Sequence, residues 1–544
     1  MNRQNIPSDF TLANARQSLK TENILSYYDS QNSSDDMETV LLTERGEKTV
    51  YDAVVPCNRC GACASICPSY QASRKETLSP RGRSQLARLL KEFRLKNPPE
   101  ALREALTDCF LCGACTDICH ASVPVPEIIV DLRKHYLKVN PGLRVKTALR
   151  LKLRYPVLYD LWLRTGLLLL QLRLPWFAKL IWTPSLLGMT PTRLQTRNIK
   201  FSFRTAKARL KKKFSRPPKH SVKWIYFSSC DTNYLMPEVA EATVSLLERH
   251  SGEGMTAENF CCGMASWRYG RTAEAREFAK KNIMLFEELR RKHGKFIIVT
   301  DCSSCAAFLK KYEQLFIRGI KEEELLREVS EKVTVLNPDP EENPDYGGDE
   351  EEKVNDGVPA GLTSPSEKQE YGERKDYSSG NETAGEDDFE SWRLRAREFA
   401  ASVRDISEVI NTGDFQKLGN CAEAENEIIC MQDSCSAVFG QKIHDNPYKL
   451  LRHIAGSRFR DLPGGPVCCG GTKANIAVNP ALSEYSSRKK MHQIASIQAG
   501  RVITTDPCCL LQLNAVLPHW YPSAKACHLS VYLNDIENRY RRTN

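Results

Sequence analysis

CNRCGACASICP, from Cys57 to Pro68, and CFLCGACTDICH, from Cys109 to His120, are the two stretches that decide how this chain begins. Each places four cysteines in the pattern CxxCxxCxxxC, which is typical of a pair of 4Fe-4S clusters. Three thiolates spaced two residues apart can surround one face of a cubane only where the chain turns tightly. The turn explains the small residues that both stretches share, which are Gly61, Ala62, Gly113 and Ala114.

The fourth cysteine of each stretch is expected to point away from the first three. In two-cluster ferredoxins this cysteine binds the other cluster, so the predicted ligand sets exchange their last members. The first set is Cys57, Cys60, Cys63 and Cys119, and the second is Cys109, Cys112, Cys115 and Cys67. Structural zinc is the alternative, but zinc is usually bound by separated CxxC pairs. The pattern therefore favours a protein that moves electrons.

Length and composition indicate several domains in a reducing compartment. A chain of 544 residues with 41% hydrophobic content can form about three domains with cores of their own. The start, MNRQNIPSDFTLANARQ, lacks the features of a secretory signal peptide. Dense thiols also fit reducing surroundings. We expect a cytoplasmic protein, with peripheral contact to the inner face of the cell membrane as an open alternative.

The net charge of +10 is unevenly distributed. Residues Asn337 to Glu390 are acidic and poor in large apolar side chains, which predicts a disordered linker. The stretch from Arg144 to Arg216 is basic and contains apolar runs, but Arg164, Arg173 and Lys179 interrupt them, so no transmembrane helix is predicted. We interpret it as amphipathic helices packed between domains. The alternative is a surface that rests on anionic lipid or on a membrane partner, with Trp162, Trp176, Phe177 and Trp182 inserted.

The remaining cysteines occur mainly in two copies of one unit. Each copy orders a strand-like run, a CCG motif, a long helical stretch and a second strand-like run, with cysteines where the runs end. The cysteines are Cys230, Cys261, Cys262, Cys302 and Cys305 in the first copy and Cys435, Cys468, Cys469, Cys508 and Cys509 in the second. The pattern predicts α/β domains whose ligands meet at one edge of a sheet.

These copies resemble the cysteine-rich CCG domains of the iron–sulfur subunits of glycolate, D-lactate and anaerobic glycerol-3-phosphate dehydrogenases, and of heterodisulfide reductases. The resemblance includes SPRGR at Ser79 to Arg83, REFAASVRDISEVI before the second copy and CHLSVYL near the end. Two cubane motifs followed by two CCG copies is the order in glycolate and lactate oxidase iron–sulfur subunits. The implied fold class is α+β multidomain, with a helical two-cluster ferredoxin domain followed by two α/β CCG domains.

The resemblance also implies ligands in each copy. In heterodisulfide reductases five cysteines hold a non-cubane iron–sulfur cluster, and the first copy has all five. Aligning the last cysteines places Asp506 opposite Cys302 and Cys508 opposite Ser304. The predicted ligands of the second copy are Cys435, Cys468, Cys469 and Cys509, with Cys527 and His528 as weaker candidates. Because a carboxylate is a harder ligand than a thiolate, a labile cluster, another metal and an empty site all stay open.

The chain contains no dinucleotide fingerprint, no paired-carboxylate site and no Ser-His-Asp set, so the chemistry on a substrate is expected elsewhere. The resemblance implies an FAD-containing dehydrogenase for glycolate, D-lactate or a similar 2-hydroxy acid as partner, and a quinone or membrane-associated acceptor. No nucleic-acid partner is expected. The alternative is a catalytic subunit that reduces a disulfide at the non-cubane cluster of the first copy.

The expected domains follow from these patterns. They are a polar N-terminal extension over 1–48, the helical ferredoxin domain over 49–140, a basic helical connector over 141–220, the first CCG domain over 221–336, the acidic linker over 337–390 and the second CCG domain over 391–544.

Overall fold

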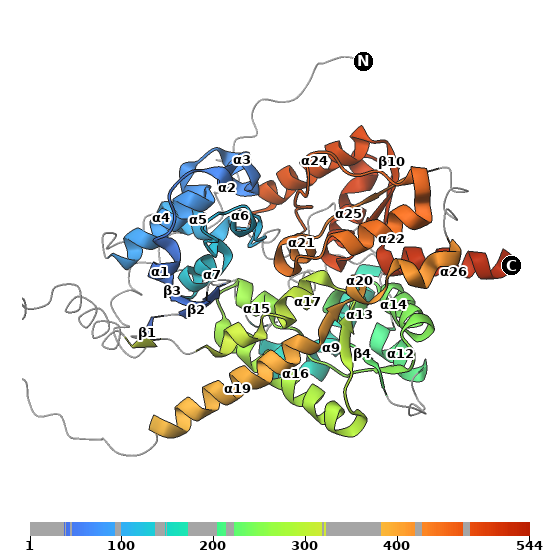
Figure 1. Cartoon of the computed structure of the whole chain (residues 1–544), viewed down its shortest axis with the longest axis horizontal. Coiled ribbons are helices and arrows are strands. Elements are labelled where there is room, and N and C mark those ends of the chain that lie inside the picture. Colours follow the sequence, from blue (N-terminus) through green and yellow to red (C-terminus); the bar gives the residue numbers. More distant parts are fainter. Residues whose placement is uncertain are drawn as a thin grey trace, which may run out of the picture.

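The computed structural model describes residues 37–38, 40–43, 46–92, 100–136, 147, 150–171, 204–213, 222–317, 320–321, 382–418, 427–471 and 479–543. They form a helical N-terminal domain and two α/β domains, each with a parallel sheet (Figure 1). The α+β multidomain fold class is therefore confirmed.

The N-terminal domain is almost entirely helical. Its elements are α1 (Val50–Val54), α2 (Ala62–Ile66), α3 (Pro68–Ser73), the 3-10 helix η2 (Glu76–Leu78), α4 (Pro80–Lys91), α5 (Glu100–Thr107), α6 (Ala114–Asp117) and α7 (Val125–Tyr136). A hairpin of β2 (Val40–Thr43) and β3 (Gly46–Thr49) precedes them, and its Leu41 is buried in the same core. The short strand β1 (Met37–Glu38) pairs with β7 (Ile320–Lys321). Residues 40–48 thus belong to this domain rather than to a separate extension.

Both cysteine motifs turn at a glycine, as the sequence predicts. Gly61 and Gly113 precede α2 and α6 with the same φ of +83°, a conformation that favours glycine. A Cβ atom at Gly61 would lie 2.6 Å from the Nη1 atom of Arg81. The tight turn brings the three closely spaced cysteines of each motif to one side of the chain.

The first CCG domain has a four-stranded parallel sheet in the order β5-β4-β6-β8. Its elements are β4 (Trp224–Tyr226), α13 (Cys230–Tyr234), α14 (Pro237–His250), β5 (Gly254–Thr256), α15 (Met264–Arg268), α16 (Thr272–His293), β6 (Ile297–Thr300), α17 (Ser303–Leu309), η3 (Tyr312–Phe316), α19 (Glu382–Ser402), β8 (Val403–Asp405), α20 (Ile406–Val409) and η5 (Thr412–Leu418).

The last part of this domain comes from beyond the acidic stretch. Strand β8 pairs in parallel with β6, and α19 packs on α16 and η3. Ala396, Phe399 and Val403 are buried in the core of the first domain. The expected boundary at residue 391 is therefore wrong. The sheet and the core of the first domain are completed by α19 and β8, which come later in the chain. The acidic stretch is an insertion within the first CCG domain, and its residues 382–390 begin α19, while 337–381 lie outside the described residues.

The second CCG domain repeats the order of β4, β6 and β8 in a sheet of three strands. Its elements are β9 (Ile428–Met431), α21 (Cys435–Gln441), α22 (Asp445–Ala455), η7 (Gly456–Arg458), α24 (Pro480–Ser496), β10 (Ala499–Thr504), α25 (Pro507–Trp520), β11 (Lys525–His528) and α26 (Leu529–Thr543). The parallel sheet has the order β11-β10-β9. His528 pairs with Thr504 as Asp405 pairs with Thr300. Strands β11 and β8 are thus equivalent.

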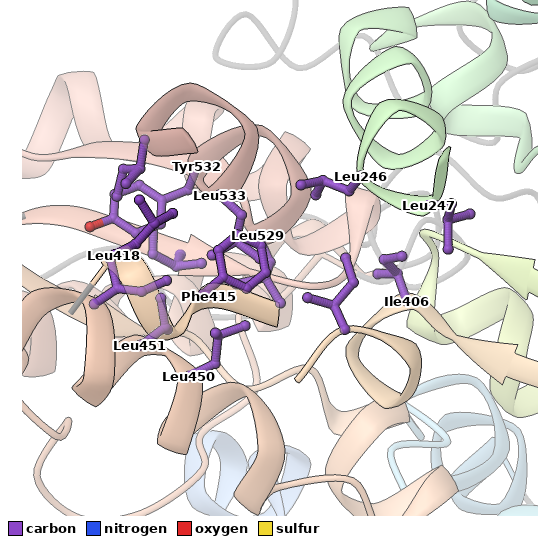
Figure 2. Close-up of a cluster of buried hydrophobic side chains, with 14 of the residues drawn as sticks. Leu246, Leu247, Ile406, Phe415, Leu418, Leu450, Leu451, Leu529, Tyr532 and Leu533 are labelled. Carbon is purple, nitrogen blue, oxygen red and sulfur yellow. The ribbon is translucent and has the colours of Figure 1, made fainter. Parts of the chain in front are cut away.

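The two CCG domains share one hydrophobic core. Figure 2 shows Leu246 and Leu247 of α14 in the same cluster as Phe415 and Leu450, together with Leu529 of α26. The domain interface also contains polar contacts, since the hydroxyls of Thr243 and Ser530 are 2.8 Å apart. The cysteine sets of the two domains are therefore held in a fixed relation.

The described part of the basic connector is helical, with α9 (Pro156–Gln171) and α12 (Ala206–Lys213). Tyr159 and Leu163 of α9 are buried against Met236 and Val239 of the first CCG domain and Leu510 of the second. Within the described ranges, no helix has the length and apolar character needed to cross a membrane. The aromatic residues Trp176, Phe177 and Trp182 lie outside those ranges.

We expect α19 to contribute strongly to the stability of the first CCG domain and the acidic insertion to contribute little. Phe399 is buried, so Phe399→Ala should cost about 3–5 kcal/mol of the free energy of unfolding and lower the midpoint of thermal unfolding. Deleting residues 345–375 should leave the midpoint unchanged, and Leu394→Ala, at an exposed position of the same helix, is the matched control. An unchanged midpoint for Phe399→Ala would contradict the assignment of α19 to the first domain.

Candidate iron–sulfur centres

The first cysteine set of the N-terminal domain includes a member from each motif. Burial raises the pKa of Cys63 to about 11, and the charges of Cys119 and Cys57 contribute in the same direction. Cys119 therefore lies beside the first motif, although it belongs to the second. Cys60 is exposed, which places this set at the protein surface.

The second set is deeper and again includes a member from the other motif. Burial raises the pKa of Cys115 well above its ordinary value, with contributions from Cys112, Cys109 and Cys67. Cys67 therefore lies beside the second motif, as Cys119 lies beside the first, and the exchange of ligands itself stays a prediction. Because α2 and α6 are in contact, the two motifs pack directly against each other.

Arg83, the last residue of the SPRGR stretch, is a buried cation beside this second set. Its Nη1 atom donates to the Cys67 sulfur at 3.7 Å, and its Nε atom donates to the Ala105 carbonyl at 2.7 Å. Its buried Nη2 atom has no hydrogen-bond partner among the described residues. A buried N–H group without a partner is costly, so this atom marks a place prepared for an acceptor.

Arg133 joins the second set to the first CCG domain. Its Nη2 atom donates to the Cys109 carbonyl at 2.9 Å and to the Leu106 carbonyl at 2.6 Å, while its Nη1 atom donates to the Arg268 carbonyl at 2.6 Å. The guanidinium thus fixes the backbone of a cysteine in one domain against α15 of the other.

The first CCG domain brings all five predicted thiols together. The sulfurs of Cys230 and Cys261 are 3.6 Å apart. Hydrogen bonds from Cys261 and Cys305 lower the pKa of Cys262. Cys305 is also hydrogen-bonded to Cys302, so the five thiols form one continuous series.

Lys152 reaches this set from the connector. Its Nζ atom donates to the Cys230 sulfur at 2.8 Å. Although burial opposes the positive charge, the thiolates of Cys230 and Cys261 hold the pKa of Lys152 well above its ordinary value. The lysine offsets part of the negative charge that clustered thiolates bring into the protein.

The second CCG domain forms the corresponding series with four thiols. The sulfurs of Cys469 and Cys509 are 3.0 Å apart. Cys468 is hydrogen-bonded to both Cys435 and Cys469. Two buried basic side chains lie beside this set. The hydrogen bond to Cys468 and burial raise the pKa of Cys435, and the charge of Arg268 opposes this rise. Burial lowers the pKa of Lys490, and the charges of Cys469 and Cys468 act in the opposite direction.

Asp506 occupies the place of the missing fifth thiol. Cys302 caps α17 by accepting from the Cys305 N–H at 3.4 Å, and Asp506 caps α25 by accepting from the Cys508 N–H at 2.8 Å. The second Asp506 carboxylate oxygen accepts from the Ser304 N–H and the Ser434 hydroxyl, each at 3.0 Å. The alignment of Asp506 with Cys302 therefore agrees with the cap positions. The carboxylate is committed to backbone and hydroxyl donors from both domains.

Cys508 lies at the domain interface, away from the series of the second domain. Its sulfur donates to the Asp231 carboxylate of the first domain at 3.2 Å. The equivalent contact on the other side joins the hydroxyls of Ser304 and Ser436, also 3.2 Å apart. The two contacts are related by the pseudosymmetry of the repeated domains.

His528 does not point to the second set as a ligand would. Its Nδ1 atom accepts from the Ser530 N–H at 3.1 Å, so its Nε2–H donates to the Asp301 carbonyl of the first domain at 2.9 Å. Both ring nitrogens are therefore engaged, and the bond from Nε2–H joins the two domains. The sequence suggested a ligand because it shows that His528 is close to the cysteines but not which way its ring faces.

The second N-terminal set lies next to the second CCG domain, although the first CCG domain follows it in the chain. Burial raises the pKa of Cys112, and the neighbouring Cys435 raises it further. Cys112, Cys435 and Cys468 line one pocket of about 340 Å³. Helices α6 and α21 are in contact there, as Figure 1 also shows. Asp506 in turn acts electrostatically on Cys302 of the first domain and on Cys509 of the second.

The donors fit iron–sulfur clusters in their chemistry. Soft thiolates are gathered in each domain, with Arg83, Lys152, Arg268 and Lys490 beside them. Within the part of the chain that the structure describes, no three or more Cys, His, Asp or Glu side chains converge as the ligands of one metal ion do. The sequence predicted the thiols but missed these four cations, although SPRGR marked one of them.

Comparisons with known proteins agree with this arrangement. Residues 53–123 match the model of the 4Fe-4S dicluster domain, and residues 224–310 and 429–514 match the cysteine-rich domain CCG. A probable glycolate oxidase iron–sulfur subunit of Bacillus subtilis is 24% identical over 482 residues, which cover 84% of this chain and 88% of the relative. The glycolate oxidase iron–sulfur subunit of Escherichia coli is 27% identical over 478 residues, which cover 85% and 91%. Lactate utilization protein A of Geobacillus kaustophilus is 22% identical over 310 residues, which cover 57% and 97%.

The chain therefore contains a 4Fe-4S dicluster domain followed by two cysteine-rich CCG domains. It is similar to glycolate oxidase iron–sulfur subunits along most of its length.

Proposed function

We propose that this chain is the electron-transfer subunit of a complex that oxidises a 2-hydroxy acid. An FAD-containing partner oxidises glycolate, D-lactate or a similar substrate, and this chain passes the electrons to a quinone or another acceptor. The names of the relatives support the type of complex. The observation that supports the relay is that Cys112 of the N-terminal domain neighbours Cys435 of the second CCG domain.

The residues that would hold clusters are the thiols already described. Two cubanes would be held by Cys57, Cys60, Cys63 and Cys119 and by Cys109, Cys112, Cys115 and Cys67; a non-cubane cluster would be held by Cys230, Cys261, Cys262, Cys302 and Cys305; and a fourth centre would use Cys435, Cys468, Cys469 and Cys509. When bound, such clusters supply single-electron steps that can empty a two-electron flavin.

The chain orders these sets in space. Starting from the exposed Cys60, the order is the first N-terminal set, the second N-terminal set, the second CCG set beside Cys112 and the first CCG set across Asp506. We infer that this is the order of electron transfer, so that the second CCG domain acts before the first. Arg83, Arg268 and Lys152 accompany successive sets and offset their negative charge.

The proposal is tested with Cys60→Ser in the complete complex. Substrate should still bleach the partner's flavin, whereas reduction of a quinone analogue should fall to background, because the first set loses one thiolate. Cys430→Ala, at a buried cysteine outside the four sets, is the matched control and should retain the flow. Quinone reduction that survives Cys60→Ser, or loss of flavin reduction in an assembled complex, would contradict the relay.

A further inference from the structure

Helix α9 exposes apolar side chains on its outer face. The exposed fractions are 57% for Tyr155, which directly precedes the helix, 78% for Val157, 55% for Leu158 and 63% for Leu161. The inner face is apolar as well, since Tyr159 and Leu163 are buried against the CCG domains. A surface helix normally turns polar residues outward. Contiguous exposed apolar side chains instead mark a contact with a membrane or another protein.

This outer face belongs to the segment that contacts the first CCG set. Lys152, one turn before α9, donates to Cys230. Its Nζ atom also lies 5.5 Å from the centre of the Tyr159 ring, and that ring packs edge-on against Tyr234 at 6.4 Å. The packed side chains of Lys152, Tyr159 and Tyr234 therefore lie between the apolar face of α9 and the first CCG set, which is the last set of the proposed order.

The charges around the face select its occupant. Arg150 and Arg154 are exposed beside it; the Arg150 side chain is 64% exposed, and its Nε atom lies 3.9 Å from a carboxylate oxygen of Glu274. From Arg144 to Arg216 the sequence has eighteen Lys and Arg residues but only one acidic residue, Asp160, which pairs with Arg164 at 2.8 Å. Exposed arginines at positions 150 and 154, beside exposed apolar side chains and within a strongly basic stretch of sequence, suit a surface of anionic lipids.

We propose that Tyr155, Val157, Leu158 and Leu161 rest in the interface of an anionic lipid bilayer, with Arg150 and Arg154 against the lipid phosphates. This deepens the proposed function, because it places the first CCG set at the membrane end of the relay. The lipid contact itself does not depend on electron transfer. It is a peripheral contact, made by a helix that lies on the bilayer.

The test uses the full-length protein, without partner or substrate, and vesicles of phosphatidylcholine with or without phosphatidylglycerol. We expect co-sedimentation with the anionic vesicles only. Arg150→Gln with Arg154→Gln should weaken it by roughly tenfold or more, and Leu158→Ser with Leu161→Ser should abolish it. The matched control is Met284→Ser with Leu394→Ser, which changes two exposed apolar residues on α16 and α19. Iron content and the thermal midpoint show that each variant is folded.

Absence of binding by the unaltered protein, equal binding to neutral vesicles, or full binding by the Leu158 and Leu161 variant would each overturn the proposal. A separate co-purification with the flavoprotein tests the other occupant: if the Leu158 and Leu161 variant still bound vesicles but lost the flavoprotein, the face would be a protein interface and the proposal would be wrong. Because vesicle binding is measured without electron flow, its failure leaves the relay standing. Failure of the Cys60→Ser test would likewise leave the lipid contact standing.

Discussion

Replacing Cys469 by Ala is expected to stop electron transfer from the N-terminal cysteine sets to the cysteine set of the first CCG domain. Cys469 is buried and occupies the middle of its series, with sulfur contacts to Cys468 and Cys509. Loss of this thiolate should remove the centre of the second CCG domain. Substrate should then still reduce the two N-terminal cubanes, while the first CCG centre stays oxidised and quinone reduction falls to background.

Low-temperature spin resonance of the complex, frozen after substrate is added, checks this order. Cys262→Ala is the matched variant, because Cys262 is the second cysteine of its CCG motif, as Cys469 is in the other domain. In Cys262→Ala the second CCG centre should still become reduced. If the first CCG centre were reduced at the normal rate in Cys469→Ala, the second domain would be a side branch and the proposed order would be wrong.

The sequence predicted what is local. The cysteine spacing predicted the tight turns at Gly61 and Gly113, because a compact motif must reverse its own chain. The strand, CCG motif, helix and strand of each copy were confirmed by β4, α16 and β6 and by β9, α24 and β10. In both cases the residues that determine the structure are close in the sequence.

What the sequence did not predict depends on distant contacts. Strand β8 completes the first sheet from beyond the acidic insertion, and no local signal distinguishes it from the start of the next domain. Lys152 is one basic residue among many in the connector, and only the fold shows that its Nζ atom meets Cys230. The contact of Cys112 with the second CCG domain likewise arises from how the domains pack.

The two CCG sites should respond differently when equivalent residues are removed. Cys302→Ala should lose the iron of one centre, because a thiol of the five-membered series is gone. Asp506→Ala should leave iron and sulfide per chain unchanged, since both carboxylate oxygens are already engaged by donors. Its effect should instead be on stability. Loss of the cap of α25 costs about 0.5–2 kcal/mol, and the buried donors left without an acceptor cost about 1–3 kcal/mol more.

Iron and sulfide assays, combined with thermal unfolding, separate these outcomes. Ser434→Ala is the matched control for Asp506→Ala, because it removes one donor to the carboxylate and leaves the carboxylate itself in place. It should cause a smaller fall in the midpoint and no change in iron. If Asp506→Ala released as much iron as Cys469→Ala, the carboxylate would have to be a ligand of the second centre. The second set would then have five donors like the first, and the disulfide-reducing alternative would regain its main structural support.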